Sequence, residues 1–117
     1  MALQENISLR PYNTFGVDAK ARYFFSVTAP QRLMPVVEGV HDASPLLVLG
    51  GGSNVLFTRD FEGLVLKNDI MGRTVIEDGP NIVRVRVGGG EDWHAFVQWC
   101  LQHRFYGLEN LSLIPGT

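Results

Sequence analysis

The sequence is poor in cysteine and in long apolar runs. Cys100 is the only cysteine among the 117 residues, so a disulfide within the chain is excluded. A lone thiol is typical of a reducing compartment. No apolar run reaches the ~20 residues that a membrane-spanning helix needs, and the first residues lack the basic and apolar regions of a signal peptide. We therefore expect a cytoplasmic protein with no membrane partner.

Charge of either sign is also sparse. Ten Lys and Arg residues stand against twelve Asp and Glu residues, which gives a net charge of −2 and a pI of about 5.8. So weak a field does not attract nucleic acid, and no nucleic-acid partner is expected. Hydrophobic residues make up 45% of the chain, an ordinary share for a globular protein, and the length allows one domain with a modest core.

The sequence offers little for metal binding or nucleophilic catalysis. His94 and His103 are nine positions apart on one predicted helix, so their side chains point in different directions, and His41 lies far from both. No Cys or carboxylate joins them at metal-ligand spacing. Ser112 does not lie in a G-x-S-x-G motif. We expect surface histidines and no metal site.

The apolar segments predict an α+β fold. Runs rich in β-formers predict strands at 22–27, 45–50, 62–68, 73–78 and 82–89. Residues 1–18 lack such a run and are expected to be irregular. A short or kinked helix is predicted over 28–40, with Thr28 as its N-cap and Pro35 as the interruption. It would join the first two strands in a βαβ unit with parallel strands.

The strongest helix is predicted over residues 91–105, with Gly107 as its C-terminal stop. Its apolar face comprises Trp93, Phe96, Val97, Cys100 and Leu101. It follows a run of three glycines at 88–90, which we interpret as a structural joint between strand and helix. Glu91 and Asp92 would stabilise the helix N-terminus and would repel a phosphate there.

A second run of three glycines, Gly50–Gly52, follows a predicted buried strand and precedes Ser53 and Asn54. Successive bare N–H groups can form a concavity that binds an anion, so a phosphate site is one interpretation. A tight turn packed under another segment is the other. The run is not a Walker A loop, because no Lys follows. It is not a good Rossmann fingerprint either, because Val55 stands where a third small residue belongs.

Four motifs together resemble the UDP-N-acetylenolpyruvoylglucosamine reductase family. They are "RPYNTFG", "LGGGSNVLF", "GGGEDWH" and "GLENLSLIPGT", and they span nearly all of the chain. The resemblance implies an FAD-binding fold of the vanillyl-alcohol oxidase type. In that fold residues 1–70 would form the N-terminal lobe and 71–117 the truncated start of the second lobe. The end in "SLIPGT", without a polar tail, predicts a fragment of a longer protein. The resemblance implies that this longer protein also has a substrate-binding domain.

The resemblance also implies a set of cofactor-binding residues. A loop would hold the FAD pyrophosphate, and a second segment would contact the flavin; the residues are Leu49, Gly50, Gly51, Gly52, Ser53, Asn54, Val55, Ile114, Pro115 and Gly116. Valine at Gly51 or at Gly52 would then be expected to remove FAD while leaving most of the fold.

The family reaction implies an NADPH-dependent oxidoreductase of peptidoglycan synthesis. NADPH reduces the flavin, and the reduced flavin reduces UDP-N-acetylenolpyruvoylglucosamine to UDP-N-acetylmuramate. Because the family's catalytic residues belong to later sequence, the fragment alone is expected to be inactive, to bind FAD weakly and to self-associate through exposed apolar side chains. Two alternatives remain: an FAD-dependent sugar or alcohol oxidase of the same fold, and a non-catalytic nucleotide-binding module.

Overall fold

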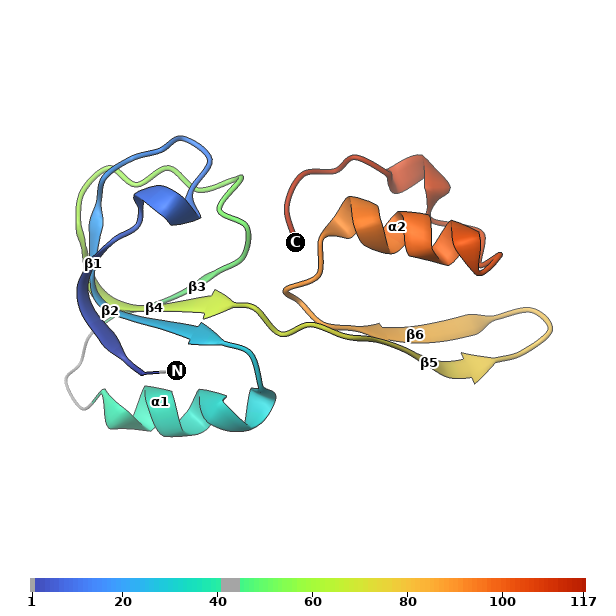
Figure 1. Cartoon of the computed structure of the whole chain (residues 1–117), viewed down its shortest axis with the longest axis horizontal. Coiled ribbons are helices and arrows are strands. Elements are labelled where there is room, and N and C mark those ends of the chain that lie inside the picture. Colours follow the sequence, from blue (N-terminus) through green and yellow to red (C-terminus); the bar gives the residue numbers. More distant parts are fainter. Residues whose placement is uncertain (1, 41–44) are drawn as a thin grey trace.

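The chain folds into two separate sheets that lie side by side along an elongated molecule of 50 × 30 × 20 Å (Figure 1). The structure is a computed structural model that describes residues 2–40 and 45–117, so His41 lies outside the described residues. The first sheet has four strands, and the second is a two-stranded hairpin covered by a helix. An α+β fold is thereby confirmed.

The first sheet has the strand order β1-β2-β4-β3. Its strands are β1 (Gln4–Ser8), β2 (Lys20–Val27), β3 (Leu46–Leu49) and β4 (Phe61–Asn68). β2 and β3 both run parallel to β4, as the βαβ prediction requires, but β4 lies between them. β1 pairs antiparallel with β2 and was missed, because its sequence QENIS is polar and mostly exposed.

Both faces of the first sheet are covered, so β4 is buried on both sides. Val65 packs on one face with Phe24 and Leu49, whereas Leu64 and Leu66 pack on the other. A strand buried on both faces reads as a continuous apolar run, which is why β4 was predictable. A short turn of 3-10 helix, η1 (Arg10–Tyr12), lies in the connection between β1 and β2.

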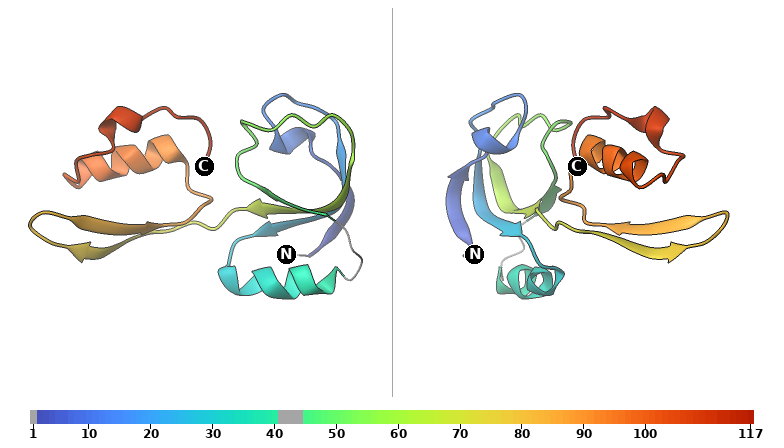
Figure 2. Two further views of the ribbon diagram at one scale, coloured as in Figure 1. Left: turned by 180° about the vertical axis from the view of Figure 1, so that it is seen from behind. Right: turned by 45° about the vertical axis from the view of Figure 1, so that its right-hand side comes forward.

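The predicted helix after β2 is short, as expected, but it starts later than predicted. A turn of 3-10 helix, η2 (Pro30–Arg32), precedes α1 (Leu33–Gly39), and Thr28 caps neither. The late start places Pro35 in the first turn of α1, where a missing N–H is tolerated. Val36 and Val37 pack against the sheet, and the two views of Figure 2 show α1 along one face of it.

The second sheet is the hairpin of β5 (Arg73–Asp78) and β6 (Val83–Val87), which pair antiparallel. The Gly79 N–H donates to the Ile82 carbonyl at 2.9 Å and closes the predicted turn. α2 (Trp93–Gln102) lies over the hairpin, and η3 (Glu109–Leu111) follows it.

The apolar face of α2 is narrower than predicted. Phe96, Val97 and Cys100 are buried, and burial raises the pKa of the Cys100 thiol, against the opposite effect of the Arg73 charge. Trp93 is only half-buried and Leu101 is 39% exposed. The prediction that Cys100 and Phe96 are core residues is confirmed, and the prediction that Leu101 belongs to the same face is wrong.

α2 ends before Gly107, the predicted stop. The Arg104 N–H donates to the Leu101 carbonyl at 3.0 Å, and the Phe105 N–H donates to the Cys100 carbonyl at 2.8 Å. These two bonds form a Schellman motif, whose left-handed position is filled by Arg104 at φ 59°. The helix therefore ends on a residue with a Cβ, which sequence rules for glycine stops do not anticipate.

The second glycine run forms a tightly packed joint between β6 and α2. A Cβ built on Gly88 would lie 2.2 Å from the Ile70 carbonyl oxygen, and one on Gly90 would lie 2.7 Å from Asp69 backbone atoms. The Gly90 N–H donates to the Ile70 carbonyl at 2.8 Å. The structural interpretation of this run is confirmed. Side chains at these positions would clash with the linker between the two sheets.

The two carboxylates after this run have different roles. Asp92 is the N-cap of α2, because its Oδ1 accepts from the Ala95 N–H at 2.8 Å. Glu91 lies outside the helix and is 8% exposed, with its Oε1 2.7 Å from the Nε of Arg73. That nitrogen has no well-directed hydrogen bond, so the contact is an ion pair. The expected capping role is confirmed for Asp92 and wrong for Glu91.

Arg104→Gly is expected to stabilise the protein by about 1 kcal/mol, because glycine adopts the left-handed conformation without the penalty that a Cβ brings. Thermal unfolding followed by circular dichroism measures the change. Arg104→Ala is the control, since it removes the side chain and keeps the Cβ. Equal stabilities of the two variants would contradict the assigned helix end.

Glu91→Gln is expected to lower the free energy of unfolding by about 2–3 kcal/mol, because it leaves the partly buried Arg73 without its countercharge. This loss is smaller than the about 3–5 kcal/mol expected when a fully buried ion pair is broken, because Arg73 is 25% exposed. Asp92→Ala, which removes only the cap, is expected to lower it by about 1 kcal/mol. Denaturant unfolding compares the two, and a smaller effect for Glu91 than for Asp92 would contradict the ion-pair assignment.

Candidate functional site: the glycine loop at the end of β3

The loop of residues 50–54 leaves the carboxyl end of β3 and runs between the two halves of the molecule. The C-terminal end of the chain lies beside this loop in Figure 1. Ligands of open α/β sheets bind outside the carboxyl ends of parallel strands. The loop therefore lies where a ligand site is expected. Its three glycines differ in what a side chain at each position would contact.

Gly52 is bare because another segment packs against it. Its φ is +72°, and a Cβ built on it would lie 1.9 Å from the Tyr12 carbonyl oxygen and 2.8 Å from the Asn13 Cα. The Thr14 N–H donates to the Gly52 carbonyl at 3.0 Å. At Gly52 the tight-turn interpretation holds. Valine there would disrupt the fold, which corrects the expectation that it would act on FAD alone.

Asn13 holds the N-terminal segment in this position. Its side-chain amide donates to the carbonyl oxygens of Leu9 at 2.7 Å and Val17 at 3.1 Å, and its Oδ1 accepts from the Val17 N–H at 3.0 Å. Tyr12 stacks on Phe24 of β2 with a centroid distance of 4.7 Å. The motif "RPYNTFG" thus orders the loop that packs against Gly52.

Gly50 and Gly51 face the other end of the chain. The exposed Gly51 donates its N–H to the Thr117 Oγ1 at 3.2 Å, and a Cβ on Gly50 would lie 2.7 Å from that same oxygen. A Cβ on Gly51 would lie 3.5 Å from the Gly116 Cα, an ordinary contact. The backbone N–H of Gly51 is thus accessible to an oxygen acceptor, a property that a loop binding a diphosphate group requires.

The residues that flank these glycines differ in what they can contact. Leu49 is 1% exposed and belongs to the core, and Val55 packs against that core, so their side chains anchor the loop. Asn54 is exposed and Ser53 half-buried. The Ser53 Oγ lies 2.8 Å from the place that a Cβ on Gly116 would occupy.

The structure brings together the two segments that the resemblance implies. Gly116, at φ +102°, lies beside Gly51 and Ser53. Its carbonyl accepts from the Trp93 N–H at 3.1 Å. Ile114 is 51% exposed, and Pro115 is exposed as well. The glycine loop and the segment that ends at Gly116 therefore form one continuous surface between the two halves.

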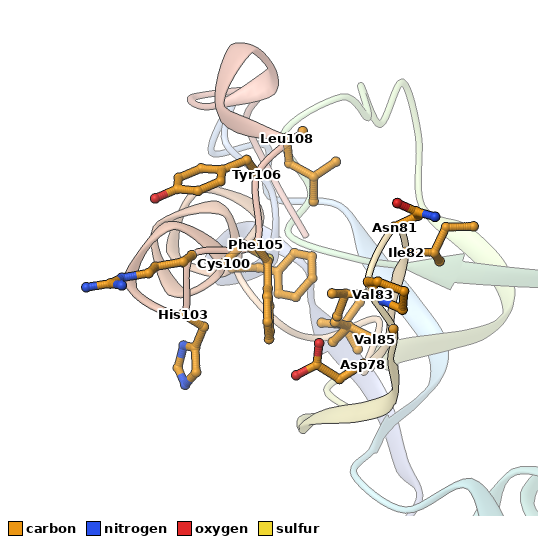
Figure 3. A pocket seen from close by; sticks show the side chains of 16 residues that line it. Asp78, Asn81, Ile82, Val83, Val85, Cys100, His103, Phe105, Tyr106 and Leu108 are labelled. Atoms are coloured by element: carbon orange, nitrogen blue, oxygen red, sulfur yellow. The ribbon is translucent and has the colours of Figure 1, made fainter.

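A separate groove of about 860 Å³ lies between the hairpin and the end of α2. Figure 3 shows Val83 and Val85 on one wall and Phe105 on the other. The alternation of Val and Arg in β6 predicts one buried face, and that face lines this groove. Its lining residues fall within 78–87 and 96–108, so the groove is distinct from the glycine loop at 50–54.

The two described histidines differ. His103 is exposed, as predicted, and its ring lies tilted against Trp99 with a centroid distance of 4.3 Å. His94 is half-buried, and its Nδ1 lies 2.6 Å from the Ser112 Oγ, so the prediction of a surface histidine is wrong there. Glu109 accepts from the Gly107 N–H at 2.7 Å, and this bond lowers the pKa of its carboxyl.

Within residues 2–40 and 45–117, no three His, Cys, Asp or Glu side chains gather where they could hold a metal ion. Of the helices in that part of the chain, none has the length and apolar character to cross a bilayer.

Comparison of the sequence with known proteins finds similar enzymes. The UDP-N-acetylenolpyruvoylglucosamine reductase of Burkholderia multivorans is 52% identical over 118 aligned positions, which cover 100% of this chain and 34% of that protein. The enzyme of the same name from Pseudomonas putida is 51% identical, with coverage of 97% and 34%. The chain thus spans about a third of the length of the curated relatives that it matches.

Comparison of structures gives the same result. The crystal structure of UDP-N-acetylenolpyruvylglucosamine reductase from Thermus caldophilus matches 99% of this chain and 39% of that one, with a TM-score of 0.70 and 26% identity. The resemblance found in the sequence is confirmed, and so is the FAD-binding type of fold. Because the profile of the family described as "FAD binding domain" matches residues 23–117, the chain belongs to the family of FAD-binding domains.

Proposed function

We propose that this chain is the FAD-binding portion of an NADPH-dependent reductase that converts UDP-N-acetylenolpyruvoylglucosamine to UDP-N-acetylmuramate. Relatives about half identical to it over its whole length carry the name of that enzyme. The observation that carries the proposal is the contact between the glycine loop and Gly116, which joins two implied cofactor segments into one surface. Such an enzyme of cell-wall synthesis would work in the cytoplasm.

The residues proposed to hold FAD divide by role. The backbone N–H groups of Gly50–Asn54 would bind the diphosphate, since bare successive amides form an anion nest. Ile114, Pro115 and Gly116 would lie along the flavin. Leu49 and Val55 would anchor the loop through the core. Bound FAD would supply the hydride carrier, and the chain's own residues bind and orient it.

The proposed division of the chain follows the two sheets. Residues 1–70 would form the first FAD-binding lobe, and 71–117 part of the second. The diphosphate site draws its loop from the first lobe and Gly116 from the second. An FAD-dependent sugar or alcohol oxidase of the same fold is the alternative, and the names of the relatives do not favour it.

The chain alone is proposed to bind FAD weakly, because a few backbone hydrogen bonds worth about 0.5–1.5 kcal/mol each barely offset the entropy of capturing a flexible dinucleotide, about 4–15 kcal/mol. Exposed apolar residues would favour its self-association. Examples are Tyr106, at 72% exposed, and Leu113, at 75%.

Gly51→Val is expected to raise the FAD dissociation constant at least about tenfold, because its side chain would fill the phosphate position while contacting Gly116 at ordinary distances. Thermal unfolding should change little. Flavin fluorescence during titration measures the affinity. Unchanged affinity in a normally folded Gly51→Val protein would contradict the proposed diphosphate loop.

Gly52→Ala should instead lower the free energy of unfolding by about 3 kcal/mol or more, since it combines positive φ with a backbone clash. Gly16→Ala is the matched control: its φ is +66° and its Cβ would meet nothing within 4 Å, so it tests the strain alone. Denaturant unfolding of both variants separates the clash from the strain, and equal losses would contradict the close packing on Tyr12.

A chimera in which this chain replaces the matching third of the Pseudomonas putida reductase tests the reaction. It is expected to bind FAD and to oxidise NADPH only when UDP-N-acetylenolpyruvoylglucosamine is present. Flavin absorbance and loss of NADPH absorbance at steady state are the two readouts. A yellow, folded chimera that consumes a sugar or alcohol with O₂, and not this substrate with NADPH, would favour the oxidase alternative.

A further inference from the structure

The N-terminal turn of α2 makes three hydrogen bonds to the segment of residues 111–116. The Trp93 indole N–H donates to the Leu111 carbonyl at 2.7 Å. The His94 Nδ1 lies 2.6 Å from the Ser112 Oγ, and the Trp93 backbone N–H donates to the Gly116 carbonyl at 3.1 Å. Two consecutive residues therefore hold both ends of the segment, and the sequence predicted no role in the cofactor site for either.

Few of the segment's side chains help to fix its path. Its apolar side chains do not enter a core, since Leu111 is 44%, Leu113 75% and Ile114 51% exposed. Its backbone is also strained, because Leu113 has φ 65° although it is not glycine, and such a conformation persists only where the surroundings enforce it. The position of Gly116 therefore depends on the contacts from α2.

We propose that Trp93 and His94 are positioning residues for the cofactor site: by holding residues 111–116 they place Gly116 against Gly51 and set the shape of the diphosphate cradle. The inference rests on the proposed function for its cofactor, and on the hydrogen bonds of α2 for its mechanism. Neither residue needs to touch FAD, because each acts through the backbone or hydroxyl group that it binds.

A catalytic interpretation of the Ser112–His94 pair is less consistent with the geometry. A nucleophilic serine needs a histidine that a third group orients. The two carboxylates closest along the chain bind backbone N–H groups instead: Asp92 accepts from Ala95, and Glu109 accepts from Gly107. The pair thus serves to attach the segment to the helix.

The first readout uses the 117-residue chain without FAD. In His94→Ala, exchange of the Trp93 indole N–H with solvent, followed by NMR, is expected to accelerate about threefold to tenfold, the range that loss of one hydrogen bond gives. His94→Asn should restore slow exchange, because its amide can replace Nδ1. His103→Ala is the control, since His103 is the C-cap at the other end of α2, and it should leave exchange unchanged. Unchanged exchange in His94→Ala would overturn the proposal.

The second readout is the FAD dissociation constant of the same four proteins, from titration to about 1 mM. We expect His94→Ala to weaken binding about threefold to tenfold, and His94→Asn and His103→Ala to match the wild type. Faster exchange with unchanged affinity would overturn the positioning role, and so would weaker binding that His94→Asn does not restore. A wild-type chain that binds no FAD would contradict the proposed function, while the exchange readout would still decide whether His94 holds the segment.

Discussion

The site depends on a stretch of backbone that two other segments approach from different sides. On one side the carbonyl of Tyr12 fills the place of a side chain at Gly52, and on the other Thr117 and Gly116 lie against Gly50 and Gly51. Any larger residue at Gly52 would push the N-terminal loop away from the end of β3. The three glycines therefore have different roles: Gly52 lets the N-terminal loop pack against the end of β3, and Gly50 and Gly51 leave the proposed diphosphate cradle open.

The second half of the molecule completes this cradle through few contacts. Its hairpin and α2 are joined to the first sheet by the linker around Ile70, against which Gly88 and Gly90 pack. The Arg73–Glu91 ion pair fixes the start of the hairpin to that joint. Because α2 in turn carries residues 111–116 through Trp93 and His94, the position of Gly116 is linked to the joint between the sheets.

The sequence predicted those elements that depend on local patterns of apolar and turn-forming residues. The buried strand β4, the turn at Gly79 and the short helix near Pro35 follow from apolar runs, turn residues and the missing proline N–H. It failed where tertiary contacts decide. The polar β1 forms because β2 offers it an edge, Arg104 ends α2 although it is not glycine, and Glu91 pairs with Arg73, a residue 18 positions earlier.

In the candidate site, too, local sequence patterns predict some features, and tertiary contacts decide the others. The sequence identified the glycine loop by its bare backbone, and the resemblance added the segment that ends at Gly116. It could not show that Gly52 packs on Tyr12 or that His94 holds Ser112, because both contacts join parts of the chain that no local pattern connects. The family match and the relatives then settle the type of domain, whereas the geometry explains why these glycines and these hydrogen bonds occur together.

The central claim is that FAD binds where the glycine loop meets the segment ending at Gly116. Mapping the backbone amide NMR shifts of the chain during addition of FAD tests it most directly. The account predicts the largest changes at Gly50–Asn54 and at Ile114 and Gly116, with little change in the groove between the hairpin and α2. Changes confined to that groove, around Val83 and Phe105, would contradict it.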